Sequence, residues 1–98
     1  LEELAEEGNS QAQYYLGKCY EKGYSVYSDM SKAEEWYHKS ADQGNADAQN
    51  ALGECYYRYN YGYYRGLQGS YADAVRWFRK AALQNHAVAQ YNLGVCYH

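Results

Sequence analysis

Proline, isoleucine and threonine are absent from this 98-residue chain, and only four of its residues are valine. Because strands are built largely from Val, Ile, Thr and aromatic residues, this shortage excludes a sheet of ordinary size. No apolar run approaches the roughly 18 residues that indicate a membrane-spanning helix, so we expect no membrane insertion. The first residues lack the charged-then-apolar pattern of a signal peptide, and none is expected.

Tyrosine, by contrast, is abundant, with 15 residues. It explains why 47% of the residues count as hydrophobic while the mean hydropathy, −0.87, is that of a polar chain. The low formal charge of −3 and the aromatic content of 18% argue against disorder. We therefore expect a folded all-α protein whose core combines small side chains with large aromatic ones.

The chain is a tandem array. Three segments align, namely AEEGNSQAQYYLGKCY from Ala5, ADQGNADAQNALGECY from Ala41 and ALQNHAVAQYNLGVCY from Ala82. Their equivalent leucines, Leu16, Leu52 and Leu93, define a period of 36 residues and then one of 41. A second block alternates with the first, as KAEEWYHKSADQG from Lys32 and DAVRWFRKAALQN from Asp73. Self-similarity at such periods is typical of stacked repeat units.

Both blocks carry apolar residues at helical spacing. In the first block Ala12, Leu16 and Tyr20 fall one turn apart on a single stripe. The aromatic residues expected in the core by this pattern are Tyr20, Trp36, Tyr37, Tyr56, Trp77, Phe78 and Tyr97. Each repeat therefore predicts an antiparallel pair of helices, and neighbouring pairs must stack because one pair cannot bury both of its faces.

The predicted helix ends carry suitable residues. The expected N-caps are Asn9, Asp29, Asn45 and Ser70, and the expected left-handed residues after helix ends are Gly8, Gly44 and Asn85. Gly17, Gly53 and Gly94 recur inside the first helix of each pair, where glycine costs about 1 kcal/mol. We interpret them as sites of close approach to the second helix, whose small residues there are Ala33 and Ala74.

These residues resemble a known family. The pattern A-x-x-G-x-x-x-A-x-x-x-L-G-x-x-Y, followed by K-A-x-x-W-Y, is similar to the Sel-one-like repeat (SLR), a relative of the tetratricopeptide repeat. The resemblance covers essentially the whole chain and implies a right-handed α/α superhelix, a solenoid that serves as a protein-interaction scaffold. The chain departs from the family where Gly23-Tyr24-Ser25-Val26 replaces a G-x-G-V ending and Tyr27 replaces the usual proline.

We predict one solenoid segment of about two and a half repeats over residues 1–98. The end of a preceding repeat is expected at 1–7, one repeat at 8–43, the next at 44–84 with a Tyr-rich inserted loop at about 57–66, and a partial repeat at 85–98. We expect the segment to be part of a longer array, because it shows no terminal repeat with a polar outer face.

The cysteines do not predict a metal site. Cys19, Cys55 and Cys96 occupy one repeat position, and equivalent helices lie no closer than the about 8–10 Å of packed neighbours. That separation is too large for a disulfide or a shared zinc ion, so we expect small apolar core residues with free thiols. Some members of the family that this chain resembles carry two cysteines per repeat that link the helix pair, and the second cysteine is absent here. Its absence favours a reducing compartment, such as the cytoplasm or an organelle matrix, or simply means that no such link is needed.

No pattern predicts catalysis. His38, His86 and His98 share no motif and are interpreted as surface or capping residues. The sequence contains no Ser-His-Asp order, zinc-protease motif or glycine-rich phosphate loop. We therefore expect no enzyme activity, no metal and no cofactor.

Two candidate binding surfaces remain. The resemblance implies a concave groove lined by the first helices, where an extended or helical partner segment would lie. The groove positions, opposite the buried stripe, are Tyr14, Lys18, Asn50, Glu54, Tyr91 and Val95. The second candidate is the segment YYRYNYGYYRGLQGSY, residues 56–71, with seven Tyr, two Arg and no acid. Its candidate contact residues are Tyr57, Arg58, Tyr59, Tyr61, Tyr63, Tyr64 and Arg65.

Three roles are open for the Tyr/Arg-rich segment. Tyr and Arg are enriched at interface hot spots, which favours a protein-binding loop. The segment can instead fold back over its own repeat, or stack single-stranded nucleic acid on its tyrosines. Two cations and an isoelectric point near 5.5 make nucleic acid the weakest of the three.

Our leading hypothesis is a non-catalytic scaffold or adaptor. It would bind a protein or peptide partner through the concave first-helix face and the Tyr/Arg-rich loop. The alternative hypothesis is a structural subunit that bridges neighbours in a large multiprotein assembly.

Overall fold

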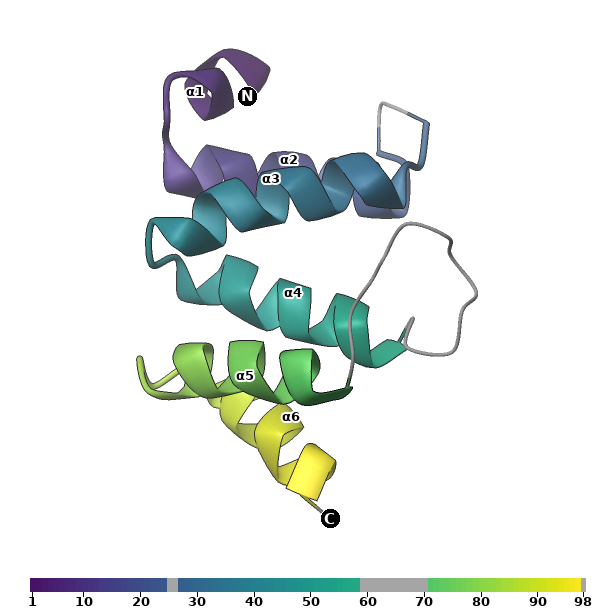
Figure 1. Ribbon diagram of the computed structural model, residues 1–98. Helices are drawn as coiled ribbons and strands as arrows, with labels where there is room; N and C mark the ends of the chain where they lie inside the picture. Colours follow the sequence, from purple (N-terminus) through teal and green to yellow (C-terminus); the bar gives the residue numbers. More distant parts are fainter. Residues whose placement is uncertain (25–26, 59–70, 98) are drawn as a thin grey trace.

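Helices account for all the regular structure in the described part of the chain, which comprises residues 1–24, 27–58 and 71–97 of a computed structural model. They are α1 (Glu2–Glu6), α2 (Ser10–Lys22), α3 (Met30–Asp42), α4 (Ala46–Arg58), α5 (Tyr71–Ala82) and α6 (Ala87–Tyr97). Figure 1 shows them following one another from the N-terminus at one end of the stack to the C-terminus at the other. The predicted all-α fold of about two and a half helix pairs is confirmed.

The N-caps explain where the helices begin. The side chain of Asn9 accepts a hydrogen bond from the backbone N–H of Ala12 at 2.9 Å, and Asn45 does the same for Ala48 at 3.0 Å. Asp29 caps α3 in the same way. Each cap satisfies one of the N–H groups that have no partner within their own helix. The three predicted caps are confirmed, while Ser70 lies outside the described residues.

Left-handed residues end the predicted helices. Gly8 and Gly44 have φ values of +100° and +91°, and Asn85 takes the same role with φ +63°. Asparagine is among the few residues that adopt this conformation at low cost. Gly23, with φ +78°, ends α2 and was not among the predicted positions.

The recurring mid-helix glycines lie where two helices approach closely. A Cβ atom added to Gly17 would lie 2.6 Å from the Tyr37 ring, and one added to Gly53 would lie 2.5 Å from the Phe78 ring. The predicted close approach is therefore confirmed for these two pairs. The nearest group is an aromatic ring of the second helix rather than the alanine one turn before it, although the Ala33 carbonyl is also close to Gly17.

The main core runs from α3 to α6 and centres on α4, where eight of 13 residues are buried. Leu52, Cys55 and Phe78 are at most 2% exposed. A smaller cluster joins α1 to α2 through Ala5 and Leu16. The core position expected for Tyr97 is wrong, because this side chain is 62% exposed and its hydroxyl contacts Arg79 of α5.

A glutamine in each first helix ties it to the preceding pair. The amides of Gln13, Gln49 and Gln90 donate to backbone carbonyls eight residues earlier, at 2.9, 3.3 and 3.2 Å. These carbonyls belong to the last turn of the preceding second helix, where they lack a partner within that helix. The repeat therefore provides a hydrogen bond at each junction. None of the described helices is long and apolar enough to cross a membrane.

Candidate functional site

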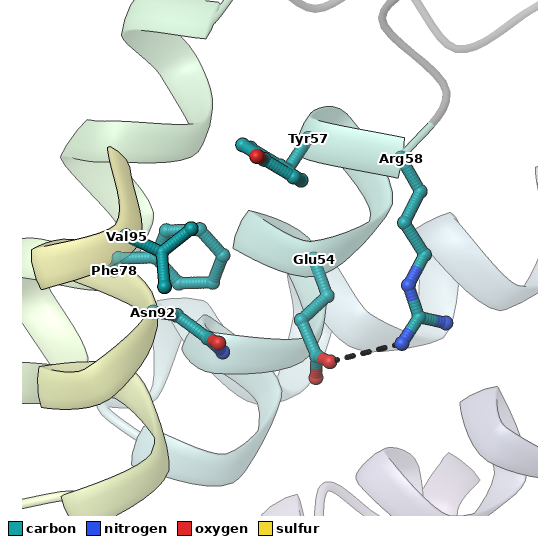
Figure 2. A pocket seen from close by; sticks show the side chains of 6 residues that line it. All are labelled: Glu54, Tyr57, Arg58, Phe78, Asn92 and Val95. Atoms are coloured by element: carbon teal, nitrogen blue, oxygen red, sulfur yellow. Dashed lines mark hydrogen bonds and ion pairs between the residues drawn. The ribbon is translucent and has the colours of Figure 1, made fainter. Parts of the chain in front are cut away.

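A pocket of about 170 Å³ opens between α4, α5 and α6 (Figure 2). Its lining residues are Glu54, Tyr57, Arg58, Phe78, Asn92 and Val95. Sites for small molecules and cofactors usually have about 300–1,000 Å³. The pocket is therefore too small for a typical cofactor and has room for about one side chain.

The pocket has an apolar side and a polar side. Figure 2 shows Phe78 and Val95 on one side and the ion pair of Glu54 and Arg58 on the other, with Tyr57 above the opening between them. Phe78 is 2% exposed, so it forms the floor, whereas Val95 is 42% exposed. An apolar group entering the pocket would be desolvated by Phe78 and Val95, and the charged pair would remain at the rim.

A chain of polar contacts crosses from α6 through α4 to α2. The Asn92 amide donates to the Asn50 side-chain oxygen at 3.1 Å, and the Asn50 amide donates to Glu54 at the same distance. Arg58 lies 3.3 Å from Glu54 and 4.0 Å from Glu21. We call these five residues the polar ladder. Because Asn50 is only 6% exposed, its amide acts mainly to hold Asn92 and Glu54 in place.

Tyr14 and Lys18 lie on the same face at the α2 end. The Lys18 ammonium is 5.7 Å from the centre of the Tyr14 ring, which in turn lies 6.0 Å from the Tyr37 ring. Burial, and then the nearby charge of Asp47, raise the pKa of Tyr14 to about 12. The phenol therefore stays neutral at physiological pH and can donate a hydrogen bond but not act as a base.

The Tyr37 hydroxyl holds Glu21, the α2 end of the polar ladder, in place. It donates to a Glu21 carboxylate oxygen at 2.5 Å, and Arg58 contacts the other oxygen of the same carboxylate. Burial and this hydrogen bond raise the pKa of Tyr37 above its ordinary value. The carboxylate at this end of the ladder is therefore fixed by contacts from α3 and α4.

The structure brings together some of the sequence-predicted site residues. Asn50, Glu54, Tyr57 and Arg58 meet at the pocket or the polar ladder, whereas Tyr14 and Lys18 lie apart from the pocket. Tyr91 is 72% exposed on α6. The predicted contact residues Tyr59, Tyr61, Tyr63, Tyr64 and Arg65 lie outside the described residues.

Sequence reasoning did not find Glu21, Phe78 and Asn92 as parts of this surface. Phe78 was assigned wholly to the core, but one side of its ring also forms the pocket floor. Asn92 lies one turn before Val95, and Glu21 lies three residues after Lys18. Helical spacing from the predicted positions would have found both of them.

A second polar cluster lies between α3 and α4. The Tyr56 hydroxyl donates to Glu34 at 2.8 Å, and His38 Nε2 lies 3.0 Å from the same hydroxyl. The Glu34 side chain in this cluster is only 17% exposed. Among the residues that the structure describes, no group of three His, Cys, Asp or Glu side chains is placed to hold a metal ion.

The three cysteines are free thiols. Cys55 and Cys96 are buried as predicted, while Cys19 is partly exposed. Burial raises the pKa of the Cys55 thiol, which disfavours the reactive thiolate.

Antiparallel helix pairs that repeat in sequence and in contacts define an α/α repeat protein. The sequence model of the Sel1 repeat matches residues 10–45, 46–86 and 87–98. The chain therefore belongs to the Sel1 repeat family, as the resemblance implied.

Solved structures agree. A protective antigen of uropathogenic Escherichia coli strains that displays an SLR fold is 43% identical, with a TM-score of 0.83 over 95% of this chain. A Sel1 repeat protein from Oxalobacter formigenes is 40% identical, with a TM-score of 0.80 over 90% of this chain. The chain spans 19% and 33% of the lengths of these two relatives. Among curated proteins, no match was found.

Proposed function

We propose that this chain binds a partner polypeptide on the face formed by α2, α4 and α6, with the pocket between α4 and α6 as its anchor. The main observation behind this proposal is that the pocket has space for one side chain and combines an apolar floor with a polar rim. Repeats of this family typically mediate protein interactions, which supports a binding role.

The composition of the site favours a protein partner. Interfaces draw most of their binding energy from a few desolvated anchors, and water is excluded by surrounding polar contacts. Phe78 and Val95 offer the apolar contact, and Tyr57 and Arg58 are of the types enriched at such anchors. The polar ladder lies beside the pocket, and its partly exposed Glu54 and Arg58 side chains can pair with polar groups of a partner.

The proposed role is binding without catalysis. The charged groups at the pocket are paired with each other, as Glu54 with Arg58, and neither is placed beside a nucleophile in the described residues. The Sel1 repeat family is generally non-catalytic, which supports this part of the proposal.

The Tyr/Arg-rich segment remains a predicted second contact. Tyr57, at its beginning, lines the pocket, and its ring lies 6.1 Å from the ring of Tyr71. A partner seated in the pocket would therefore lie next to both ends of the segment. The alternative role, a structural subunit of a large assembly, uses the same surface with a permanent partner.

The test uses a matched charge substitution. Val95→Glu introduces a negative charge at the pocket. Glu54 occupies the same position in the preceding repeat, so the fold is expected to accept a glutamate there. Peptides are first selected on the wild-type chain from a phage-displayed random library. Their affinities for both forms are then measured by fluorescence anisotropy. We expect at least about tenfold weaker binding by Val95→Glu, because a charge would be desolvated in the pocket.

Ser31→Glu provides the control, since it adds the same charge on α3, away from the pocket. Selected peptides should bind this variant as they bind the wild type. Equal binding to Val95→Glu would show that the pocket is not the anchor. Preference for single-stranded oligonucleotide over every selected peptide, with affinity that falls steeply with salt, would favour the nucleic-acid role instead.

A further inference from the structure

The pocket between α4 and α6 lies where one repeat departs from the other two. Asn50 stands at the repeat position that Tyr14 and Tyr91 occupy. The Tyr14 ring lies 6.0 Å from the ring of Tyr37, in the second helix of the same pair. Asn50 has no ring to place in this way against Phe78, which corresponds to Tyr37 in the next pair. The pocket therefore opens at a departure of this chain from its own repeat.

Two neighbours of Tyr14 have counterparts in the pocket lining. The Tyr37 ring lies beside the Tyr14 ring, and the Lys18 ammonium lies 5.7 Å from the centre of the same ring. One repeat later these two positions are held by Phe78 and Glu54, and both residues line the pocket. The pocket therefore corresponds to the place that the Tyr14 ring fills one repeat earlier.

Aromatic rings lie on two sides of the pocket. Phe78 forms the floor, and Figure 2 shows Tyr57 above the opening. Aromatic rings attract one another in tilted and offset arrangements, beyond what the buried area contributes. An aliphatic side chain would make only the apolar contact. The lining therefore favours an aromatic side chain over an aliphatic one of similar size.

The rim of the pocket offers a hydrogen-bond acceptor. Because an ionised carboxylate can only accept, the Asn50 amide must turn its NH2 group to Glu54 and its oxygen to Asn92. Asn92 therefore uses its own NH2 group on Asn50, and no donor in the described part of the chain reaches the Asn92 side-chain oxygen. Since Asn92 lines the pocket, a ring that carries a donor group can pair with this oxygen.

We propose that the pocket takes the side chain of a tyrosine from the partner polypeptide, with the ring on Phe78 and the hydroxyl donating to the Asn92 side-chain oxygen. The inference rests on the proposed function, because it names the residue that fills the anchor pocket. Every lining residue belongs to α4, α5 or α6, so the site is formed by helices on both of its sides.

The first experiment uses three small probes, which are the N-acetyl amides of tyrosine, phenylalanine and leucine. Each is titrated into the 15N-labelled chain, and shifts of the Asn92 side-chain amide and the Val95 backbone amide report binding. We expect the tyrosine probe to bind about two- to tenfold more tightly than the phenylalanine probe, for one hydrogen bond. The phenylalanine probe should bind more tightly than the leucine probe. Equal affinities, strongest binding by leucine, or shifts confined to other surfaces would overturn the proposal.

The decisive variant fills the pocket from within the chain. The double substitution Asn50→Tyr with Asn92→Ala copies Tyr14 and Ala51, which hold these positions in the preceding repeat, so the fold is expected to accept it. It supplies a ring and removes the acceptor. The tyrosine probe should bind this variant at least about tenfold more weakly. Wild-type affinity in a variant that unfolds at the wild-type temperature would overturn the proposal.

Asn92→Ala alone separates the hydroxyl contact from the ring contact. This variant leaves the floor in place and removes the side-chain oxygen, so the tyrosine and phenylalanine probes should bind it equally. Ser31→Glu, away from the pocket on α3, should bind all three probes as the wild type does. A preference for tyrosine that persists in Asn92→Ala would overturn the assigned hydrogen bond.

Peptides selected on the wild-type chain distinguish this inference from the proposed function. Where binding depends on Val95, we expect one peptide tyrosine whose change to leucine weakens binding at least about tenfold. Dependence on Val95 without dependence on any tyrosine would overturn this inference and leave the proposed function standing. Equal binding to the wild type and Val95→Glu would overturn the proposed function, whatever the small probes show.

Two other sources of the tyrosine are separate outcomes. Self-association of the chain in sedimentation experiments, lost in the double variant, would show that a second copy fills the pocket. Tighter binding of the tyrosine probe after serine replaces Tyr59, Tyr61, Tyr63 and Tyr64 would show that the chain fills the pocket itself. Either result would overturn the assignment to a partner polypeptide.

Discussion

Two tyrosines of the core, Tyr37 and Tyr56, each pair a buried ring with a carboxylate through the phenol hydroxyl. The hydroxyl of Tyr37 donates to Glu21, and that of Tyr56 donates to Glu34. Each ring is buried while its hydroxyl reaches the edge of the core. Each of these hydrogen bonds requires a protonated phenol, because an ionised phenol would place its negative oxygen beside the negative carboxylate in a site with little water.

Alkaline pH should therefore destabilise the fold. Burial comes first among the causes that raise the pKa values of Tyr14, Tyr37 and Tyr56 above the ordinary 10, to about 12 for Tyr14. A pKa that is higher in the folded than in the unfolded state leaves stability unchanged below about pH 10. Stability then falls as the pH rises towards 12 and beyond. Urea unfolding midpoints at pH 8, 9, 10 and 11 measure this effect.

Tyr37→Phe is the control for this prediction. Phe78 occupies the equivalent position, so the ring should be accepted at Gly17. The variant should lose about 0.5–1.5 kcal/mol at pH 8 with its hydrogen bond, and should lose less further stability between pH 10 and 11 than the wild type. A wild-type midpoint that is constant from pH 8 to 11 would contradict the account.

At the scale of the element, α6 begins with an unusual N-cap. His86 Nδ1 accepts from the backbone N–H of Ala89 at 3.1 Å, while Nε2 lies 2.8 Å from the Asp47 carboxylate. These contacts assign the proton to Nε2, which donates to Asp47. Asn45 makes both kinds of contact in the preceding repeat, because it caps α4 and donates to Gln11 at 2.9 Å.

The equivalence of His86 and Asn45 predicts the effect of substitutions at His86 on stability. His86→Asn should be within about 0.5 kcal/mol of the wild type, because asparagine can cap α6 and donate to Asp47 as Asn45 does to Gln11. His86→Ala should cost about 1 kcal/mol or more, since the cap and the Asp47 contact are both lost. Urea unfolding at pH 8 measures both variants. Equal losses in the two would show that the capping contacts contribute nothing.

At the scale of the whole molecule, stability should be unevenly distributed. The helices contact mainly their neighbours in sequence. The helices α3, α4 and α5 each pack against a helix on both sides, and α4, which also touches α6, has the largest number of buried residues. The five-residue α1 at one end and α6 at the other are each covered on one side only (Figure 1). In repeat proteins, stability is approximately the sum of each unit and its contacts with its neighbours.

Rates of amide hydrogen exchange should reflect this uneven distribution of stability. Amides of α4 should exchange slowest, those of α3 and α5 at intermediate rates, and those of α1 and α6 fastest, since terminal units open without unfolding the centre. Native-state exchange followed by NMR measures the rates residue by residue. Uniform protection from α1 to α6 would contradict a stack held by neighbour contacts and would indicate one all-or-none unit.

The repeat period, the helix pairs and most helix ends could be predicted from the sequence, because their causes are local. Asn9, Asn45 and Asp29 cap the residues that follow them directly, and Gly8, Gly44 and Asn85 end helices through their own φ angles. The close contacts at Gly17 and Gly53 could also be predicted from the sequence, since a recurring glycine inside a helix indicates a close approach of another group.

The candidate site was only partly predictable, because it depends on residues far apart in sequence. The buried Asn50 accepts a hydrogen bond from Asn92, 42 positions later, and Phe78 of α5 lines the pocket together with residues of α4 and α6. The sequence by itself determined the repeat and its helices through spacing and local capping. Only the tertiary structure decided which side chains meet across the helices, because each contact depends on what the neighbouring helix places there: the Tyr37 ring at Gly17 and the Phe78 ring at Gly53.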